Sequence, residues 1–143
     1  MGQLRTSPPP PQAAELERWV LDTPEELRDV RASLRDALNR HGLVQGEDLD
    51  EVPHMVLLVA TELSSNALRH GRPPTIVTLL CTDDRFLLDV ADHDVSSVPE
   101  LTDISPTDSG GRGLFLAQSI SLDVGWYATE TTKHIWASFP RKG

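Results

Sequence analysis

The segment VATELSSNALRHG, Val59–Gly71, decides the fold because it carries two different stripes of side chains. Apolar residues in and just before it recur at the spacing of an amphipathic helix with one face in a core: Val52, Val56, Val59, Leu63 and Ala67. A polar stripe of Glu62, Asn66 and His70 repeats every four residues and points to one side of the same helix. A carboxylate one turn from a carboxamide, beside a buried face, suits a site that binds a metal and moves a proton.

The polar stripe has a second interpretation, because Glu, Asn and His on a helix usually form a solvated face. Glu62 would then pair with a surface cation such as Arg69, an interaction that contributes little to stability. Two further segments of the chain favour the functional interpretation, since both suit the same ligand.

Length and composition restrict the classes of protein to consider. The 143 residues are enough for one domain with its own core. No apolar run is long enough to span a membrane and the N-terminus has no signal-peptide pattern, so we expect a cytoplasmic protein without membrane contact. The formal charge of −9 argues against direct nucleic-acid binding, which needs basic patches. The single cysteine, Cys81, excludes an internal disulfide and a multi-cysteine metal site.

The chain is predicted to consist of a tail and one folded domain. Residues 1–14 are proline-rich and lack apolar periodicity, which is typical of a disordered tail, and 15–143 form the domain. One helix is predicted over 24–40, with Thr23 before it and Gly42 after it. A second helix is predicted over 48–70 and ends at Gly71, since Pro73-Pro74 prevents its continuation.

Five strands complete the prediction, over residues 16–21, 75–82, 85–91, 124–129 and 134–139. Alternation within 85–91 predicts a sheet with one wetter face. The segment 92–109 has the length and composition of a lid or binding loop, and a short helix is predicted after Gly113. Because helices come early and strands pair as hairpins, we expect an α+β two-layer sandwich, with a mixed or antiparallel sheet and the helices on one face.

Two segments beyond the second helix suit a nucleotide. Asp92 follows a buried strand, where a carboxylate can accept a hydrogen bond from the amino group of adenine. The alternative for Asp92 is a turn-forming aspartate that binds its own backbone. The run Gly110-Gly111-Arg112-Gly113-Leu114 precedes the short predicted helix, so its backbone N–H groups and the helix N-terminus can bind phosphate, with Arg112 adding a positive charge.

Together these segments resemble the motifs of the GHKL ATPases, the superfamily of gyrase B, the large heat-shock chaperone ATPases, histidine kinases and MutL. The run from Glu62 to His70 resembles the N box, Asp92-His93-Asp94 falls at the first glycine box, and Gly111-Arg112-Gly113-Leu114-Phe115 is similar to the second. The resemblance covers about residues 16–139. It implies the Bergerat fold of the histidine-kinase-like ATPase domain, which binds ATP between the helices beneath a flexible lid.

The resemblance also implies a role for each motif residue. Asn66 is expected to bind Mg²⁺ through its side-chain oxygen and Asp92 to recognise adenine. Gly111 and Gly113 are expected at the lid hinge and the phosphates, beside Arg112 and Leu114, and His70 is expected at the nucleotide through the N box. Glu62 occupies the position of the general base in those subfamilies that have one.

The resemblance is closest to the stand-alone anti-sigma factor serine/threonine kinases. Two features of the chain support this: its length is that of a free-standing domain, and a glutamate precedes the N-box asparagine. It implies a sigma factor and a small anti-anti-sigma protein as partners, phosphorylation of the latter, and a possible homodimer. The first glycine box departs from its DxGxG pattern, since Asp94 replaces a glycine. This departure favours a different class, a nucleotide-dependent interaction module that regulates transcription or signalling without phosphorylating anything. An α+β domain without nucleotide is the third alternative.

Overall fold

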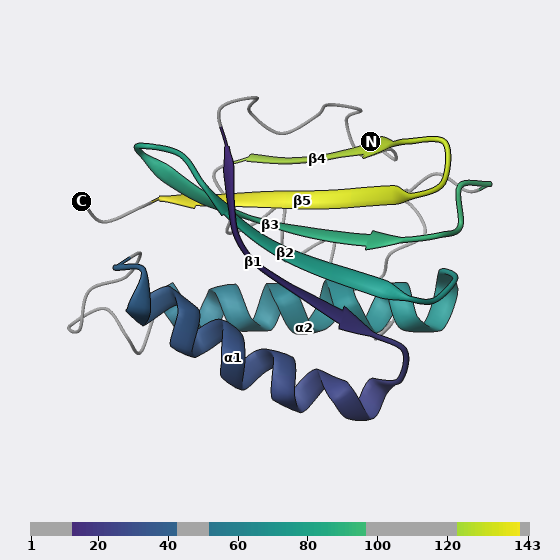
Figure 1. Ribbon diagram of the computed structural model, residues 1–143, viewed down its shortest axis with the longest axis horizontal. Coiled ribbons are helices and arrows are strands. Elements are labelled where there is room, and N and C mark those ends of the chain that lie inside the picture. Colours follow the sequence, from purple (N-terminus) through teal and green to yellow (C-terminus); the bar gives the residue numbers. More distant parts are fainter. Residues whose placement is uncertain (1–12, 43–51, 97–122, 141–143) are drawn as a thin grey trace.

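The computed structural model describes residues 13–42, 52–96 and 123–140, which form a sheet and a layer of helices (Figure 1). The elements in chain order are β1 (Ala14–Leu21), the 3-10 turn η1 (Pro24–Glu26), α1 (Leu27–Arg40), α2 (Val52–His70), β2 (Thr75–Cys81), β3 (Arg85–Asp92), β4 (Asp123–Ala128) and β5 (Lys133–Pro140).

The sheet has five strands in the order β1-β2-β3-β5-β4, and each neighbouring pair is antiparallel. Both described helices lie on one side of it, with α2 running along the sheet and α1 beside α2 (Figure 1). This arrangement confirms the predicted α+β two-layer sandwich, and of the two predicted sheet types the described strands form the antiparallel one.

The helix α2 packs its apolar stripe into the core between the two layers. Of the predicted stripe, Val56, Val59, Leu63 and Ala67 are buried, and the side chain of Val52 lies outside the described residues. The sheet contributes a facing set of buried side chains: Val77, Leu79, Phe86, Leu88, Val90, Ala137 and Phe139. Each fully buried valine, leucine or phenylalanine side chain of this set stabilises the fold by about 1.5–3 kcal/mol. Within the described ranges, neither helix has the combination of length and apolarity needed to cross a membrane.

The predicted helix over 24–40 is found as the 3-10 turn η1 followed by α1, which begins at Leu27 and ends at Arg40 as predicted. The Glu26 carboxylate accepts hydrogen bonds from the backbone N–H groups of Asp22 and Thr23, at 2.8 Å and 3.0 Å, which orders the chain entering η1 and α1. At the other end, Gly42 has a φ of +66°, the left-handed conformation that a helix-ending glycine adopts readily. Glu17 on β1 binds the side chains of Arg40 and His41, so the end of α1 is joined to the edge strand.

Some predicted boundaries need correction. The strand β1 begins at Ala14, inside the segment predicted as tail, because its pairing with β2 extends to Ala14 opposite Cys81. Strand β5 begins one residue earlier than predicted, at Lys133. Residues 1–12, 48–51 and 97–122 lie outside the described residues, so the remaining tail, the start of the second helix, most of the predicted loop and the short helix stay predictions.

The predicted wetter face of the third strand is wrong. Leu87, Asp89 and Ala91, the positions assigned to that face, are 0%, 5% and 1% exposed. Strand β3 is central in the sheet, with β2 on one side and β5 on the other, so its neighbours' side chains cover both of its faces. Asp89 tolerates this burial because Tyr127 and His134 bind its two oxygens.

Candidate functional site

Glu62 and Asn66 lie one turn apart on α2, at the border between its buried stripe and its exposed side. Both are half-buried, whereas Leu63 and Ala67 beside them pack in the core at 2% and 8% exposure. The border position holds a carboxylate and a carboxamide against a rigid layer while leaving them accessible to a ligand. The predicted same-sided placement of these two residues is therefore confirmed.

Three polar side chains gather at one end of the sheet, where β2 begins, β3 ends and β5 begins. Asp92 is opposite Lys133 in the register of β3 and β5. Ile76 is opposite Ala91, so one further step along both strands places Thr75 beside Asp92. Strand alternation puts this row on the side of the core and the helices. Thr75, Asp92 and Lys133 are only 0%, 5% and 9% exposed.

The loop after α2 fixes Asp92 next to the end of that helix. The N–H of Gly71 donates to the carbonyl of Ala67 at 2.8 Å, and the N–H of His93 donates to the carbonyl of Arg72 at 3.0 Å. A Cβ atom at Gly71 would lie 2.4 Å from Asp92 Cγ and 2.6 Å from Asp92 Oδ2, closer than real Cβ contacts. Glycine at this position therefore allows the Asp92 carboxylate to lie against the helix end.

The two oxygens of Asp92 have different surroundings. Oδ1 accepts a hydrogen bond of 2.7 Å from the backbone N–H of Asp94, so the turn-forming interpretation of Asp92 holds for this oxygen. Oδ2 lies 3.9 Å from Lys133 Nζ. The carboxylate of Asp94 accepts from the N–H and the hydroxyl of Ser96, at 3.1 Å and 2.6 Å. Its negative charge is therefore partly compensated by local donors.

Comparison with known proteins assigns the family. The family model described as histidine kinase-like ATPase domain matches residues 20–139, more than half of the chain. The chain belongs to this family. No match was found among the curated proteins. Membership in the histidine kinase-like ATPase family implies ATP binding and supports an ATP-binding regulatory protein, and it confirms the GHKL resemblance at the level of the family.

The polar row fits the base of the ATP expected for a histidine kinase-like ATPase domain. Thr75 Oγ1 is buried and has no hydrogen-bond partner among the described residues. An unpaired buried hydroxyl costs about 1–3 kcal/mol, and such groups usually have a ligand, an ion or a water as partner. Asp92, a residue only 5% exposed, adds a carboxylate acceptor of the kind that the amino group of adenine satisfies. The donors and acceptors that a purine ring carries thus have counterparts here.

The remaining predicted site residues of this ATPase domain are not described by the structure. Gly111, Arg112, Gly113 and Leu114 lie outside the described residues, as does the side chain of His70. Their nucleotide contacts, and Mg²⁺ binding by Asn66, stay predictions. Sequence reasoning missed the placement of Thr75 and Lys133 beside Asp92, although each is a polar residue at or next to the predicted start of an apolar strand.

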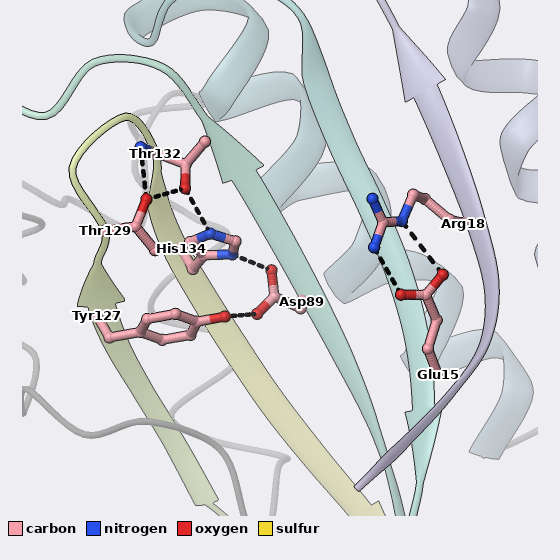
Figure 2. A network of polar contacts seen from close by, with 7 residues as sticks. All are labelled: Glu15, Arg18, Asp89, Tyr127, Thr129, Thr132 and His134. Carbon is pink, nitrogen blue, oxygen red and sulfur yellow. Dashed lines mark hydrogen bonds and ion pairs between the residues drawn. The ribbon is translucent and has the colours of Figure 1, made fainter. Parts of the chain in front are cut away.

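A second polar cluster of the ATPase domain lies on the sheet face that the helices do not cover (Figure 2). His134 Nδ1 is 2.7 Å from Asp89 Oδ1, and the Tyr127 hydroxyl donates to Asp89 Oδ2 at 3.2 Å. The Tyr127 and His134 rings stack at a centroid distance of 4.4 Å, and Thr132 Oγ1 lies 2.8 Å from His134 Nε2. Burial and the Asp89 carboxylate raise the pKa of Tyr127 well above its usual range. Figure 2 also shows Arg18 and Glu15 paired along β1.

Proposed function

We propose that the protein is an anti-sigma factor that uses ATP to phosphorylate a serine or threonine of a small anti-anti-sigma protein. The observation that carries the proposal is the placement of Glu62 one turn before Asn66 on α2, both half-buried on the border of the core. A glutamate there is next to the expected magnesium ligand and accessible to a second protein. This is the arrangement that a base for a partner's hydroxyl requires.

Each residue has a separate task in this proposal. Asp92 accepts a hydrogen bond from the adenine amino group and orients the base. Asn66 contributes an oxygen ligand to Mg²⁺, a hard ion that binds oxygen and phosphate. Glu62 accepts the proton of the partner's hydroxyl. When bound, ATP would supply the phosphoryl group and Mg²⁺ would offset part of the negative charge of the phosphates. The protein's main contribution is therefore to hold the reacting groups in line.

The partners follow from the same proposal. A sigma factor is bound and released according to the phosphorylation state of the anti-anti-sigma protein, in the cytoplasm, and the kinase acts as a homodimer. The acidic charge of −9 is compatible with a basic partner surface and does not suit direct nucleic-acid binding.

Asp94 supports a second candidate function, a nucleotide-dependent interaction module without phosphoryl transfer. Asp94 replaces a glycine of the first glycine box, and its backbone N–H donates a hydrogen bond to Asp92. Two donors of Ser96 reduce its repulsion of a triphosphate, but they do not remove the added bulk. In this alternative, ATP binding changes the affinity for a partner and Glu62 has no chemical role.

A phosphoryl-transfer assay separates the two functions. The purified protein is mixed with γ-labelled Mg-ATP and a candidate anti-anti-sigma protein that carries a serine, and the label on the partner is measured. We expect transfer by the parent and a loss of about a hundredfold or more in Glu62→Gln, since general-base catalysis typically contributes about 10²–10⁴-fold. Glu25→Gln is the matched control, because Glu25 is an exposed glutamate on η1, away from α2.

The outcomes are distinct. Transfer that survives in Glu62→Gln contradicts the role given to Glu62. Partner binding that requires ATP but leaves no phosphoserine in the parent supports the interaction module instead. Asn66→Ala tests the metal ligand separately, since we expect it to remove the dependence of ATP binding on Mg²⁺ in calorimetric titration while Glu62→Gln retains it.

A further inference from the structure

Lys133 is an unusual residue to find at the end of a core. Lysines are almost never fully buried unless they are paired, yet Lys133 is 9% exposed. Its Nζ lies 3.9 Å from Asp92 Oδ2, and the two side chains are 10% and 7% exposed. This distance exceeds the usual hydrogen-bond range of about 2.7–3.2 Å. The pair is therefore a buried ion pair with a gap between its two polar atoms.

A gapped pair of this kind offers a donor and an acceptor side by side. The ammonium group carries three N–H donors and no acceptor, and the carboxylate carries only acceptors. Lys133 can thus attract Asp92, contact another group and still donate to a ligand. Because each further hydrogen bond to a buried ion pair offsets part of the cost of removing its charges from water, a ligand edge with the opposite pattern is favoured at this place.

The edge of adenine has that opposite pattern. Its amino group is a donor, and the adjacent ring nitrogen N1 is an acceptor. The register fixes the order of the protein groups, because β3 ends at Asp92 and β5 begins at Lys133 directly opposite. Both lie on the helix-facing side of the sheet, where the site residues of α2 also lie.

We propose that Lys133 is a specificity-determining residue that donates a hydrogen bond to N1 of adenine while Asp92 accepts one from the amino group. The inference rests on the nucleotide site of the proposed function and not on phosphoryl transfer. The competing explanation is structural: Lys133 only balances the charge of Asp92 and contacts no ligand. The two explanations differ in what happens when the ring nitrogen is removed from the nucleotide.

Calorimetric titration with base analogues tests the proposal. The parent protein and Lys133→Met are titrated with ATP, with 1-deaza-ATP, which lacks N1, and with 7-deaza-ATP, a matched analogue that keeps N1 and the amino group. Because hydrogen bonds to charged groups contribute about 1.5–3 kcal/mol, we expect the parent to bind 1-deaza-ATP about ten- to a hundredfold more weakly than ATP. It should bind 7-deaza-ATP about as tightly as ATP.

In Lys133→Met we expect ATP and 1-deaza-ATP to bind with equal affinity. Equal discrimination in the parent and the variant overturns the proposal and leaves Lys133 as a structural counter-ion. Equal affinity of the parent for ATP and 1-deaza-ATP, or a preference of the parent for GTP, overturns it as well.

Two features keep the test decisive. Lys133→Met leaves Asp92 buried without its cation and can fail to fold, so Lys133→Gln is a second variant that keeps an N–H donor without the charge. We expect it to retain a reduced discrimination between ATP and 1-deaza-ATP, and no discrimination there contradicts the donor role. The test also separates this inference from the kinase proposal. Discrimination between ATP and 1-deaza-ATP without phosphoryl transfer supports the role of Lys133 and rejects only the kinase. Phosphoryl transfer without this discrimination supports the kinase and rejects the role of Lys133.

Discussion

Replacing Gly71 with alanine tests whether the helix end and the Asp92 carboxylate are in close contact. The φ of Gly71 is not in the left-handed region, which among the described glycines only Gly42 adopts. From backbone conformation alone, Gly71→Ala is therefore expected to stabilise the fold by about 0.4–1 kcal/mol, because alanine restricts the unfolded chain.

The contacts of Gly71 predict the opposite result. The added Cβ would lie 2.4 Å from Asp92 Cγ, 2.6 Å from Asp92 Oδ2 and 2.7 Å from the Ala67 carbonyl oxygen. Overpacking of this kind costs about 1–3 kcal/mol, so we expect a net loss of about 1–2 kcal/mol. For a domain of this size, about 4 °C of melting temperature corresponds to each kcal/mol, so the variant should melt about 4–8 °C lower.

The variant should also bind ATP more weakly, because Asp92 must move to make room for the methyl group. A hydrogen bond to a charged group contributes about 1.5–3 kcal/mol, which corresponds to about ten- to a hundredfold in affinity. Thermal unfolding and calorimetric titration measure the two effects. Gly42→Ala is the control: nothing lies within 4 Å of a Cβ there, but its φ of +66° makes alanine strained. It should lose stability and keep ATP affinity.

A double mutant identifies the contact responsible. In an Asp92→Ala background, two of the three close contacts of the new Cβ disappear, so the stability cost of Gly71→Ala should fall by about 1 kcal/mol or more. The reasoning is refuted if Gly71→Ala is as stable as the parent and binds ATP equally well, or if its cost is unchanged without Asp92.

Three further predictions concern the rest of the domain. Tyr127 is the single tyrosine of the chain, so an ultraviolet titration reports its ionisation alone. We expect Tyr127 to ionise well above the ordinary pKa of 10.0, and Asp89→Asn should lower the raised pKa of Tyr127. Hydrogen bonding from His41, aided by Arg40, lowers the pKa of Glu17 below 4.5. The contribution of Glu17 to stability is therefore present above pH 4.5 and is lost as the pH falls through the lowered pKa. In denaturant unfolding, Glu17→Gln should be less stable than the parent at pH 7 and equally stable in acid. A difference in stability that does not depend on pH contradicts this prediction. Leu34→Ala removes a fully buried side chain and should cost about 2–5 kcal/mol in the same unfolding experiment.

Much of the fold was predictable because its signals are local. The apolar stripe of α2, Thr23 and Gly42 at the ends of the first helix, and the apolar runs of the strands follow from spacing within a few residues. The two faces of β3 were not predictable in this way. Asp89 has the alternation of a solvent-facing residue, but its burial depends on Tyr127 and His134 from strands far along the chain.

In the candidate site, too, the residues with local signals were predicted and those that depend on contacts between strands were not. Glu62 and Asn66 were predicted because helical spacing alone puts them on one side. Thr75 and Lys133 were missed because the register between neighbouring strands brings them beside Asp92. No pattern within a few residues of sequence predicts that register. Gly71 was predicted as a helix end, and that is where it lies. Its reason for being glycine, the approach of Asp92, involves a residue on another strand.

Consecutive residues of β5 pair with two buried carboxylates on opposite faces of the sheet: Lys133 faces Asp92 and His134 faces Asp89. A shift of β5 by one residue against β3 would turn every side chain of the strand to the other face. Each carboxylate would then lose its present basic partner, and an uncompensated buried charge costs several kcal/mol. The apolar residues of β5 discriminate less strongly between the two alignments, since both faces of β3 bury apolar side chains. The polar partners of the two carboxylates thus select one strand pairing among those that hydrophobic burial alone would permit.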